Sequence, residues 1–153
     1  MRLEGSRSRR RRSLSARALR NLRRGRLQRT LSAATAASAL PLGVEIYFEH
    51  YRGSFGDKWK WTPIALTPAL VAAGVAGVVS GRAARTALPL ASALFALDGA
   101  IGVVTHVRGV ARKPGGFQEP LYNIVMGPPL LAPGSLVMVG GIGLLAAALP
   151  RER

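Results

Sequence analysis

The stretch TPIALTPALVAAGVAGVVS, residues 62–80, contains no charged side chain and is long enough to cross a membrane as one helix. A bilayer core about 30 Å thick takes roughly 20 helical residues. Residues 120–150 are also free of charge, residues 86–105 hold one charged residue, Asp98, and residues 30–44 hold none. The chain therefore carries four separate apolar runs of this kind.

These runs predict an all-α fold, a bundle of four transmembrane helices. The first run extends to residue 51 if a membrane helix tolerates Glu45 and Glu49 near its end. A stretch of 18 or more apolar residues with few charges is typical of a spanning helix. The predicted spans cover about residues 31–51, 62–80, 86–106 and 130–149.

Composition limits what else the chain can hold. The spans take about half of the 153 residues, so residues 30–150 form one membrane domain with no room for an ordinary soluble catalytic domain. Cysteine is absent, which excludes disulfides, thiolate metal sites and thiol nucleophiles. No nucleophile elbow, phosphate-binding loop or zinc-protease motif occurs. A non-enzymatic role is expected.

Residues 1–29 form an arginine-rich head with twelve arginines and one acidic residue. We expect a cytoplasmic tail, disordered or folded as an interfacial helix, that stays close to anionic lipid headgroups. Apolar residues recur every four positions within residues 13–29, which favours a short amphipathic helix on the membrane. Such a helix would hold Arg20, Arg23 and Arg24 against the headgroups.

Two other interpretations of this head are a nucleic-acid-binding arm and a targeting peptide. Phosphate binding needs mainly positive charge, but no aromatic residue lies between these arginines to stack on bases, so nucleic acid is disfavoured as a partner. A targeting peptide fits the Arg-rich and Ser-rich composition. However, residues 31–40 are dominated by Ala, Ser and Thr, which suits the start of a span better than a signal-peptide core.

The distribution of basic residues predicts the orientation. With the N-terminus in the cytoplasm, sixteen basic residues lie on the inner side and six on the outer side, which favours cytoplasmic N- and C-termini. Trp59 and Trp61 have the amphipathic rings that collect at headgroup level, so they mark the outer interface. Lys113, in the second outer loop, is placed to meet lipid phosphate. Richness in Ala, Gly, Arg and Pro suggests a bacterial protein of the cytoplasmic membrane.

Residues 108–129 mix a basic start with several glycines and prolines. Irregular backbone is tolerated at membrane depth only where protein or water satisfies its polar groups. We therefore interpret this segment as an extracytoplasmic loop that is interfacial or re-entrant. The alternative is one long final span that begins at Leu121 and breaks at Pro128 and Pro129.

Glycine spacing marks helix faces that could pack closely. Gly77 and Gly81 form a Gly-x-x-x-Gly pair, and Gly140, Gly141 and Gly143 form a second patch. Small residues at these spacings let a neighbouring backbone approach. We expect helix contacts at both places.

Ionisable side chains within spans cost about 2.5–3.5 kcal/mol at the helix centre, so they indicate function. The candidates are Glu45, Glu49, His50, Asp98 and His106. In the predicted topology they gather toward the outer leaflet, with Asp98 closest to the midplane. We predict a membrane component that binds a partner subunit or a small ligand at this cluster. A second copy of the chain is a further candidate partner.

Two cofactor interpretations compete with this one. Carboxylate and imidazole groups on facing helices can hold metals, which makes Glu45, Glu49 and His106 a candidate metal site. The Glu-x-x-His spacing of di-iron bundles is absent, however. Alternatively, His50 and His106, at matched depth on the first and third spans, could ligate a haem.

A proton- or cation-coupled transport role is a further alternative, because acidic residues and histidines within spans often line ion paths. Asp98, His106 and the two glutamates would form that path. The ordinary interpretation needs no ligand at all. Glu49 would pair with Arg52 one turn away, the histidines would be wet interfacial residues, and Asp98 would hydrogen-bond a neighbouring helix.

Overall fold

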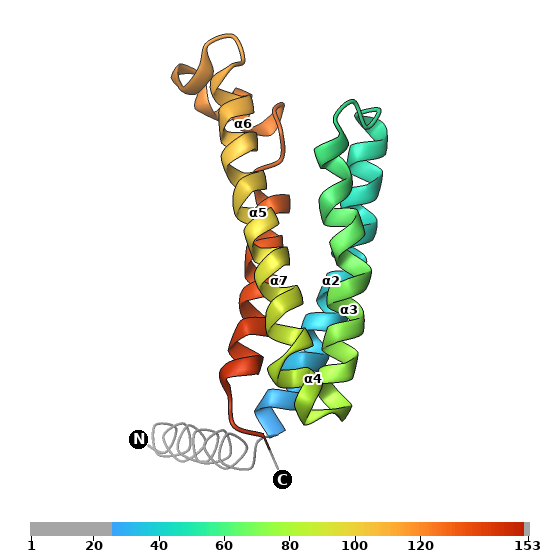
Figure 1. The fold of residues 1–153 in the computed structure, drawn as a ribbon. Coiled ribbons are helices and arrows are strands. Elements are labelled where there is room, and N and C mark those ends of the chain that lie inside the picture. The colour runs from blue at the N-terminus through green and yellow to red at the C-terminus, as the bar shows by residue number, and fades with distance from the viewer. Residues whose placement is uncertain (1–25, 152–153) are drawn as a thin grey trace, which may run out of the picture.

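The computed structural model describes residues 26–151, and every regular element in that range is a helix, as predicted. Four helices are long (Figure 1): α2 (Arg26–Arg52), α3 (Thr62–Val79), α5 (Ala87–Ala111) and α7 (Leu131–Ala148). Four short helices join them: η1 (Lys58–Trp61), α4 (Gly81–Arg85), η2 (Gly116–Gln118) and α6 (Pro120–Val125). The predicted amphipathic helix over residues 13–29 lies mostly outside the described residues.

The long helices run alternately up and down and pack as two pairs. α2 packs mainly on α3 and α5 mainly on α7, while contacts of α2 with α7 and of α3 with α5 complete the bundle. In Figure 1 the pairs lie together near α4 and diverge toward the end that carries α6. We call the first the closed end, where α2 begins, α3 and α7 end, and α4 lies. The other is the open end, formed by residues 53–61 and 112–130.

Each long helix is long and apolar enough to cross a membrane. These four candidate spans indicate an integral multi-pass membrane protein. The 18 residues of α3 and of α7 give each helix a length of about 27 Å, which is close to the thickness of a bilayer core.

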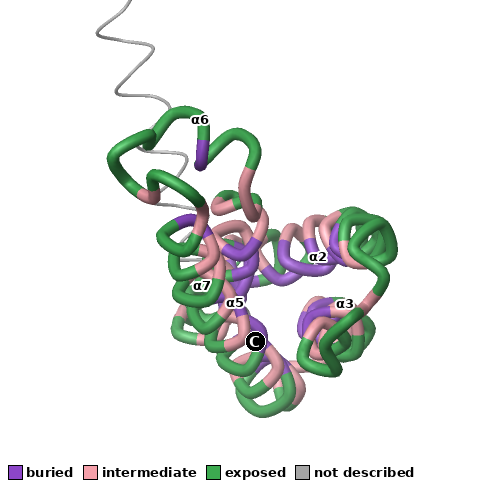
Figure 2. Tube along the Cα trace, turned by 90° about the horizontal axis from the view of Figure 1, so that it is seen from above, coloured by how far each residue is buried: buried purple, intermediate pink, exposed green. Residues whose placement is uncertain are grey.

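Burial supports this conclusion, because many large apolar residues are exposed while small residues line the helix contacts. Figure 2 shows exposed residues on the outer sides of the helices and buried ones where the helices meet. A soluble bundle would bury the large ones, whereas lipid tails accept them, and small residues let membrane helices approach closely. Leu70 and Phe95 fill the centre of the bundle. The exposed large residues include Leu40, Val75, Leu94, Leu97, Ile101 and Met138.

Local sequence explains where several helices begin and end. Pro63 lies in the first turn of α3, where its missing N–H leaves no internal bond unmade. Ser80 separates α3 from α4, and its Oγ accepts a hydrogen bond from Ala83 N at 3.2 Å. α2 continues through Pro41 as one helix, and α5 runs on to Ala111, beyond the predicted end at residue 106.

Two of the three predicted packing glycines in the last span contact a neighbouring helix. A Cβ at Gly140 would lie 2.6 Å from Ser92 O and 2.8 Å from Ala96 N, and one at Gly143 would overlap Ser92 Oγ. Gly141 points away, with no atom within 4 Å of its Cβ position. Close packing of α5 on α7 therefore depends on Gly140 and Gly143, which lie three residues apart on one helix face, and not on the whole patch.

The segment between α5 and α7 folds around one buried amide. Nδ2 of Asn123 donates to Pro114 O at 2.9 Å and to Gly116 O at 2.7 Å. Gly115 and Gly116 have φ values of 79° and 47°, in the left-handed region that glycine adopts without strain. α6 ends at Val125 and α7 begins at Leu131, so the helix is interrupted around Pro128 and Pro129, which both interpretations of this segment allow.

Arg151 fastens the closed end. Its Nη1 donates to Gln28 Oε1 at 3.0 Å and also to Gly77 O, and its Nη2 donates to Val78 O at 2.7 Å. The buried Gln28 in turn donates to Ser32 Oγ at 2.8 Å. The chain three residues beyond the end of α7 is thus tied to the start of α2 and to the last carbonyls of α3.

Candidate functional site

The inward face of α2 passes through Gly43 and Ile46 and reaches His50, which is half-buried. This spacing of three and four residues is one face of a helix. Glu45 and Glu49 lie off this face and are exposed. Of the three predicted α2 residues, only His50 is turned toward the rest of the bundle.

Asp98 links the two helix pairs. Thr62 Oγ1, on the first residue of α3, lies 2.5 Å from Asp98 Oδ1 on α5 and 2.8 Å from Trp59 O. The hydroxyl has one proton for two acceptors, so it cannot fully satisfy both when Asp98 is ionised. Within residues 26–151, Asp98 forms no ion pair.

His50 stands near this hydrogen bond. Asp98, His106 and Lys60 are all close enough to the His50 ring to act on its charge. Within the described chain, His50 Nδ1 is buried and has no hydrogen-bond partner. An unsatisfied buried nitrogen is unfavourable, so a ligand or water that bonded to it would stabilise the site.

His106 has a defined proton arrangement. Its Nδ1 lies 2.8 Å from Pro129 O, and because a carbonyl oxygen only accepts, Nδ1 must carry the proton and donate it. In the neutral ring Nε2 then keeps its lone pair. The same bond holds the segment before α7 against α5. We call His50, Thr62, Asp98 and His106 the polar site.

The predicted metal set is not brought together. Glu49 instead accepts a hydrogen bond from Arg52 Nη1 at 3.0 Å, which confirms the ordinary interpretation of that pair. Among residues 26–151, no three His, Asp or Glu side chains lie close enough to hold a metal ion. Glu45 and Glu49 therefore do not join His106. The haem prediction for His50 and His106 is tested by no contact and stays a prediction.

Aromatic residues cover the open end of the α2–α3 pair. The rings of Phe55 and Trp61 stack with centroids 4.2 Å apart, and Tyr47 and Tyr51 pack around them. The turn between the helices places Phe55 at φ 44°, in the left-handed region, which is unusual for a bulky residue. Sequence reasoning missed Phe55 and Thr62, because neither residue type is distinctive at a span boundary.

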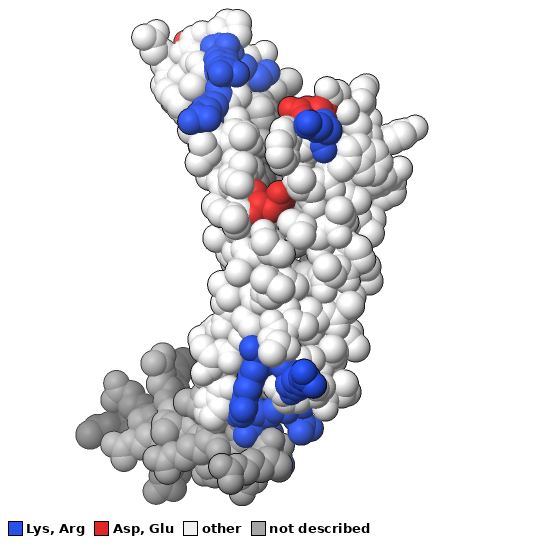
Figure 3. Space-filling model, viewed as in Figure 1, with Lys and Arg blue, Asp and Glu red and all other residues white. Residues whose placement is uncertain are grey.

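The predicted headgroup residues are distributed over the molecule. Arg20, Arg23 and Arg24 lie outside the described residues. Trp59 and Trp61 are exposed at the open end, and Lys113 lies half-buried at the same end on the other helix pair. Their contact with headgroups stays a prediction. Basic and acidic residues both appear at this end in Figure 3. A further acidic patch lies between the pairs, nearer the middle of the bundle.

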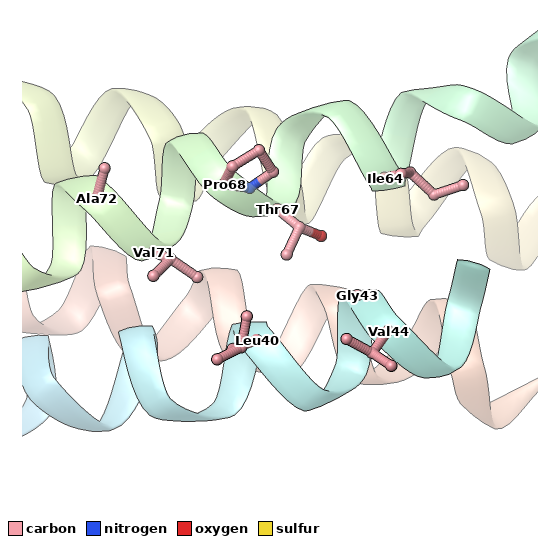
Figure 4. Close-up of a pocket in the computed structure, with 8 residues that line it drawn as sticks. All are labelled: Leu40, Gly43, Val44, Ile64, Thr67, Pro68, Val71 and Ala72. Carbon is pink, nitrogen blue, oxygen red and sulfur yellow. The ribbon is translucent and has the colours of Figure 1, made fainter. Parts of the chain in front are cut away.

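An open groove of about 380 Å³ lies between α2 and α3, away from the polar site. In Figure 4 Thr67 points toward α2 where Gly43 leaves room for it, and Thr67 Oγ1 donates back to Pro63 O at 2.7 Å. The groove is therefore apolar, and the hydroxyl of Thr67 is already used in a hydrogen bond within α3. Its lining residues are Leu40, Gly43, Val44, Ile64, Thr67, Pro68, Val71 and Ala72.

The polar site can accept hydrogen bonds and attract positive charge through the Asp98 carboxylate, and Nε2 of a neutral His106 ring is a second acceptor. Comparison with known proteins gave no significant match: no family model, no curated protein and no solved structure corresponds to this chain.

Proposed function

We propose that the protein is a non-enzymatic multi-pass membrane component that binds a small cationic ligand at the polar site. The observation that carries this proposal is the half-buried Asp98 carboxylate, which contacts Thr62 and has no cationic partner within residues 26–151. A carboxylate at membrane depth is unfavourable unless a proton, a cation or a strong donor compensates its charge.

The neighbouring groups favour a cationic ligand over an anionic one. The His106 ring, bonded to Pro129 O through Nδ1, keeps an acceptor nitrogen, and His50 Nδ1 is free of hydrogen bonds within the described chain. A small ammonium group donates hydrogen bonds, so it suits a site composed of acceptors. Lys60 is the cation close to this site, and it lies beside His50.

The test uses the full chain purified in detergent, with ammonium and tetramethylammonium chloride as probes and sodium chloride at equal ionic strength as the reference. A ligand that binds the folded protein raises its thermal midpoint. We expect ammonium to raise the midpoint of the wild-type protein by a few degrees, and tetramethylammonium, which has no N–H to donate, to raise it less. Asp98→Asn keeps an acceptor for Thr62 but removes the charge, so this variant should not respond.

Glu49→Gln is the matched control, because it removes one carboxylate from the exposed face of the neighbouring helix. It should respond as the wild-type protein does. Equal responses in the Asp98→Asn and Glu49→Gln variants, or no response in the wild-type protein, would contradict the proposal. The protein could instead co-purify with a membrane subunit at a fixed ratio, and lose that subunit in the Asp98→Asn variant. The ligand would then be a basic side chain of a second subunit and not a small molecule.

We also propose that both termini are cytoplasmic, so that the polar site opens toward the outside of a bacterial cytoplasmic membrane. The supporting observation is that Arg82, Arg85 and Arg151 join the start of α2 at the closed end. Because the chain lacks cysteine, single-cysteine variants report orientation directly. A membrane-impermeant maleimide should label Gly56→Cys in intact cells and spare Thr86→Cys; the reverse pattern would invert the topology.

A further inference from the structure

The closed end concentrates arginines from three parts of the chain. Arg29 comes from the first turns of α2, Arg82 and Arg85 from α4, and Arg151 from the end of α7. Arg29 and Arg85 both lie close enough to act on the charge of Arg151. Desolvation and these two neighbouring charges lower the pKa of Arg151, although an arginine remains protonated at neutral pH.

Two features hold these side chains together. The guanidinium of Arg151 is fixed by its bonds to Gln28, Gly77 and Val78, so it cannot move away from its like-charged neighbours without losing them. Arg82 and Arg85 are three apart on one helical turn, so they share one side of α4. The cluster is therefore built by the fold.

The cluster has no counter-charge in the described chain. The acidic residues among positions 26–151 are Glu45, Glu49, Asp57, Asp98 and Glu119, and all lie toward the open end or at mid-height. At the closed end of the visible face, Figure 3 shows blue basic residues and no red acidic residue among those described. The side chains of Arg29, Arg82 and Arg85 are exposed and donate no hydrogen bond to any residue in 26–151. Their donors are free for an anion.

The cluster also lies at the right depth for a lipid phosphate. α4 follows α3 directly after Ser80, and Ala148 ends α7 three residues before Arg151. The arginines thus begin where the apolar spans stop, which is where headgroups begin. Guanidinium groups match phosphate geometry, because their planar donors bond two oxygens at once.

We propose that Arg29, Arg82 and Arg85 bind the phosphate of an anionic lipid headgroup, and that Arg151 positions them by fastening the end of α7 to α2 and α3. Phosphate in solution offers the same chemistry, so the test must separate the two sources. The inference is independent of the polar site and of the orientation of the protein in the membrane.

The experiment measures lipid retained by the full chain in detergent, by native mass spectrometry during titration with phosphatidylglycerol or phosphatidylcholine. The test variant carries Arg29→Gln, Arg82→Gln and Arg85→Gln. Each basic residue near an anionic surface contributes about fivefold in affinity, so the three changes should weaken phosphatidylglycerol binding roughly 100-fold. Wild-type protein should prefer phosphatidylglycerol to phosphatidylcholine.

The matched control carries Lys58→Gln, Arg108→Gln and Arg112→Gln, which removes three exposed charges from the open end and leaves the arginine-rich head unchanged. It should keep near wild-type affinity. Equal loss in both triple variants would overturn the site, since net charge alone would then explain binding. Inorganic phosphate that binds as tightly as phosphatidylglycerol would overturn the lipid assignment.

Discussion

The two ends of the bundle are held by different means. At the closed end, Gly74 brings α3 against Ser32 and Ala36 of α2, and Arg151 joins three helices through its guanidinium. At the open end, the α2–α3 pair is finished by stacked aromatic rings and the α5–α7 pair by a loop folded around Asn123. Each pair is thus completed separately.

The comparison shows why the ionisable residues stand where they do. Between the helices near the closed end, small residues leave no room for a polar ligand, because the backbones approach closely there. Between the diverging pairs, Thr62 and Asp98 form a hydrogen bond, with His50 close to it. In the proposed role, the closed end would keep the fold while the open end exchanges a ligand.

The largest expected effect comes from filling the close contact at the α5–α7 interface. A Gly140→Ala methyl would lie within 2.8 Å of Ala96 N and closer to Ser92 O, so the helices must separate. Overpacking of this kind costs about 1–3 kcal/mol in free energy of unfolding. The mole fraction of SDS at which half of the protein is unfolded should fall. Gly141→Ala, which meets open space, is the control and should change little.

A smaller effect is expected from removing the side-chain hydrogen bonds of Arg151 at the closed end. Arg151→Ala removes a charged donor from Gln28, Gly77 and Val78, and should lower the free energy of unfolding by about 1–2 kcal/mol. The same SDS titration measures it. Arg112→Ala removes an exposed arginine at the open end and serves as control. If both variants have the same free energy of unfolding, the hydrogen bonds of Arg151 add nothing to stability.

The smallest effect is expected at the link between the pairs. Thr62→Val keeps the side-chain shape but loses the bond to Asp98, and should lower the free energy of unfolding by about 0.5–1.5 kcal/mol. Thr105→Val, whose hydroxyl bonds only locally to Gly102 O, is the control. If Thr62→Val lowered the free energy of unfolding more than Arg151→Ala does, the expected order of the two effects would be reversed.

Some features were readable from local spacing. The pairing of Glu49 with Arg52 follows from their separation of three residues in a helix, and the structure confirms it. The packing role of Gly140 and Gly143 also followed from their spacing. The role assigned to Gly141 was wrong, because a run of glycines does not indicate which member faces the neighbour.

The sequence predicted only some of the residues that form the polar site. His50, Asp98 and His106 were predicted, but grouping Glu45 and Glu49 with them required knowledge of which face of α2 turns inward. In a soluble helix an apolar stripe identifies that face. Here apolar residues surround each span, because lipid and bundle interior are equally apolar, so no stripe exists.

The sequence by itself determined four apolar helices, the all-α class and the irregular segment before the last helix, because span length and helix termination depend on neighbouring residues in the chain. Only the tertiary structure decided the bond between Thr62 and Asp98 and the clasp of Arg151 on Gln28, residues 36 and 123 positions apart. These contacts depend on how the helices rotate and cross. In a lipid-facing bundle, close packing of small residues sets that geometry, and one-dimensional hydropathy does not encode it.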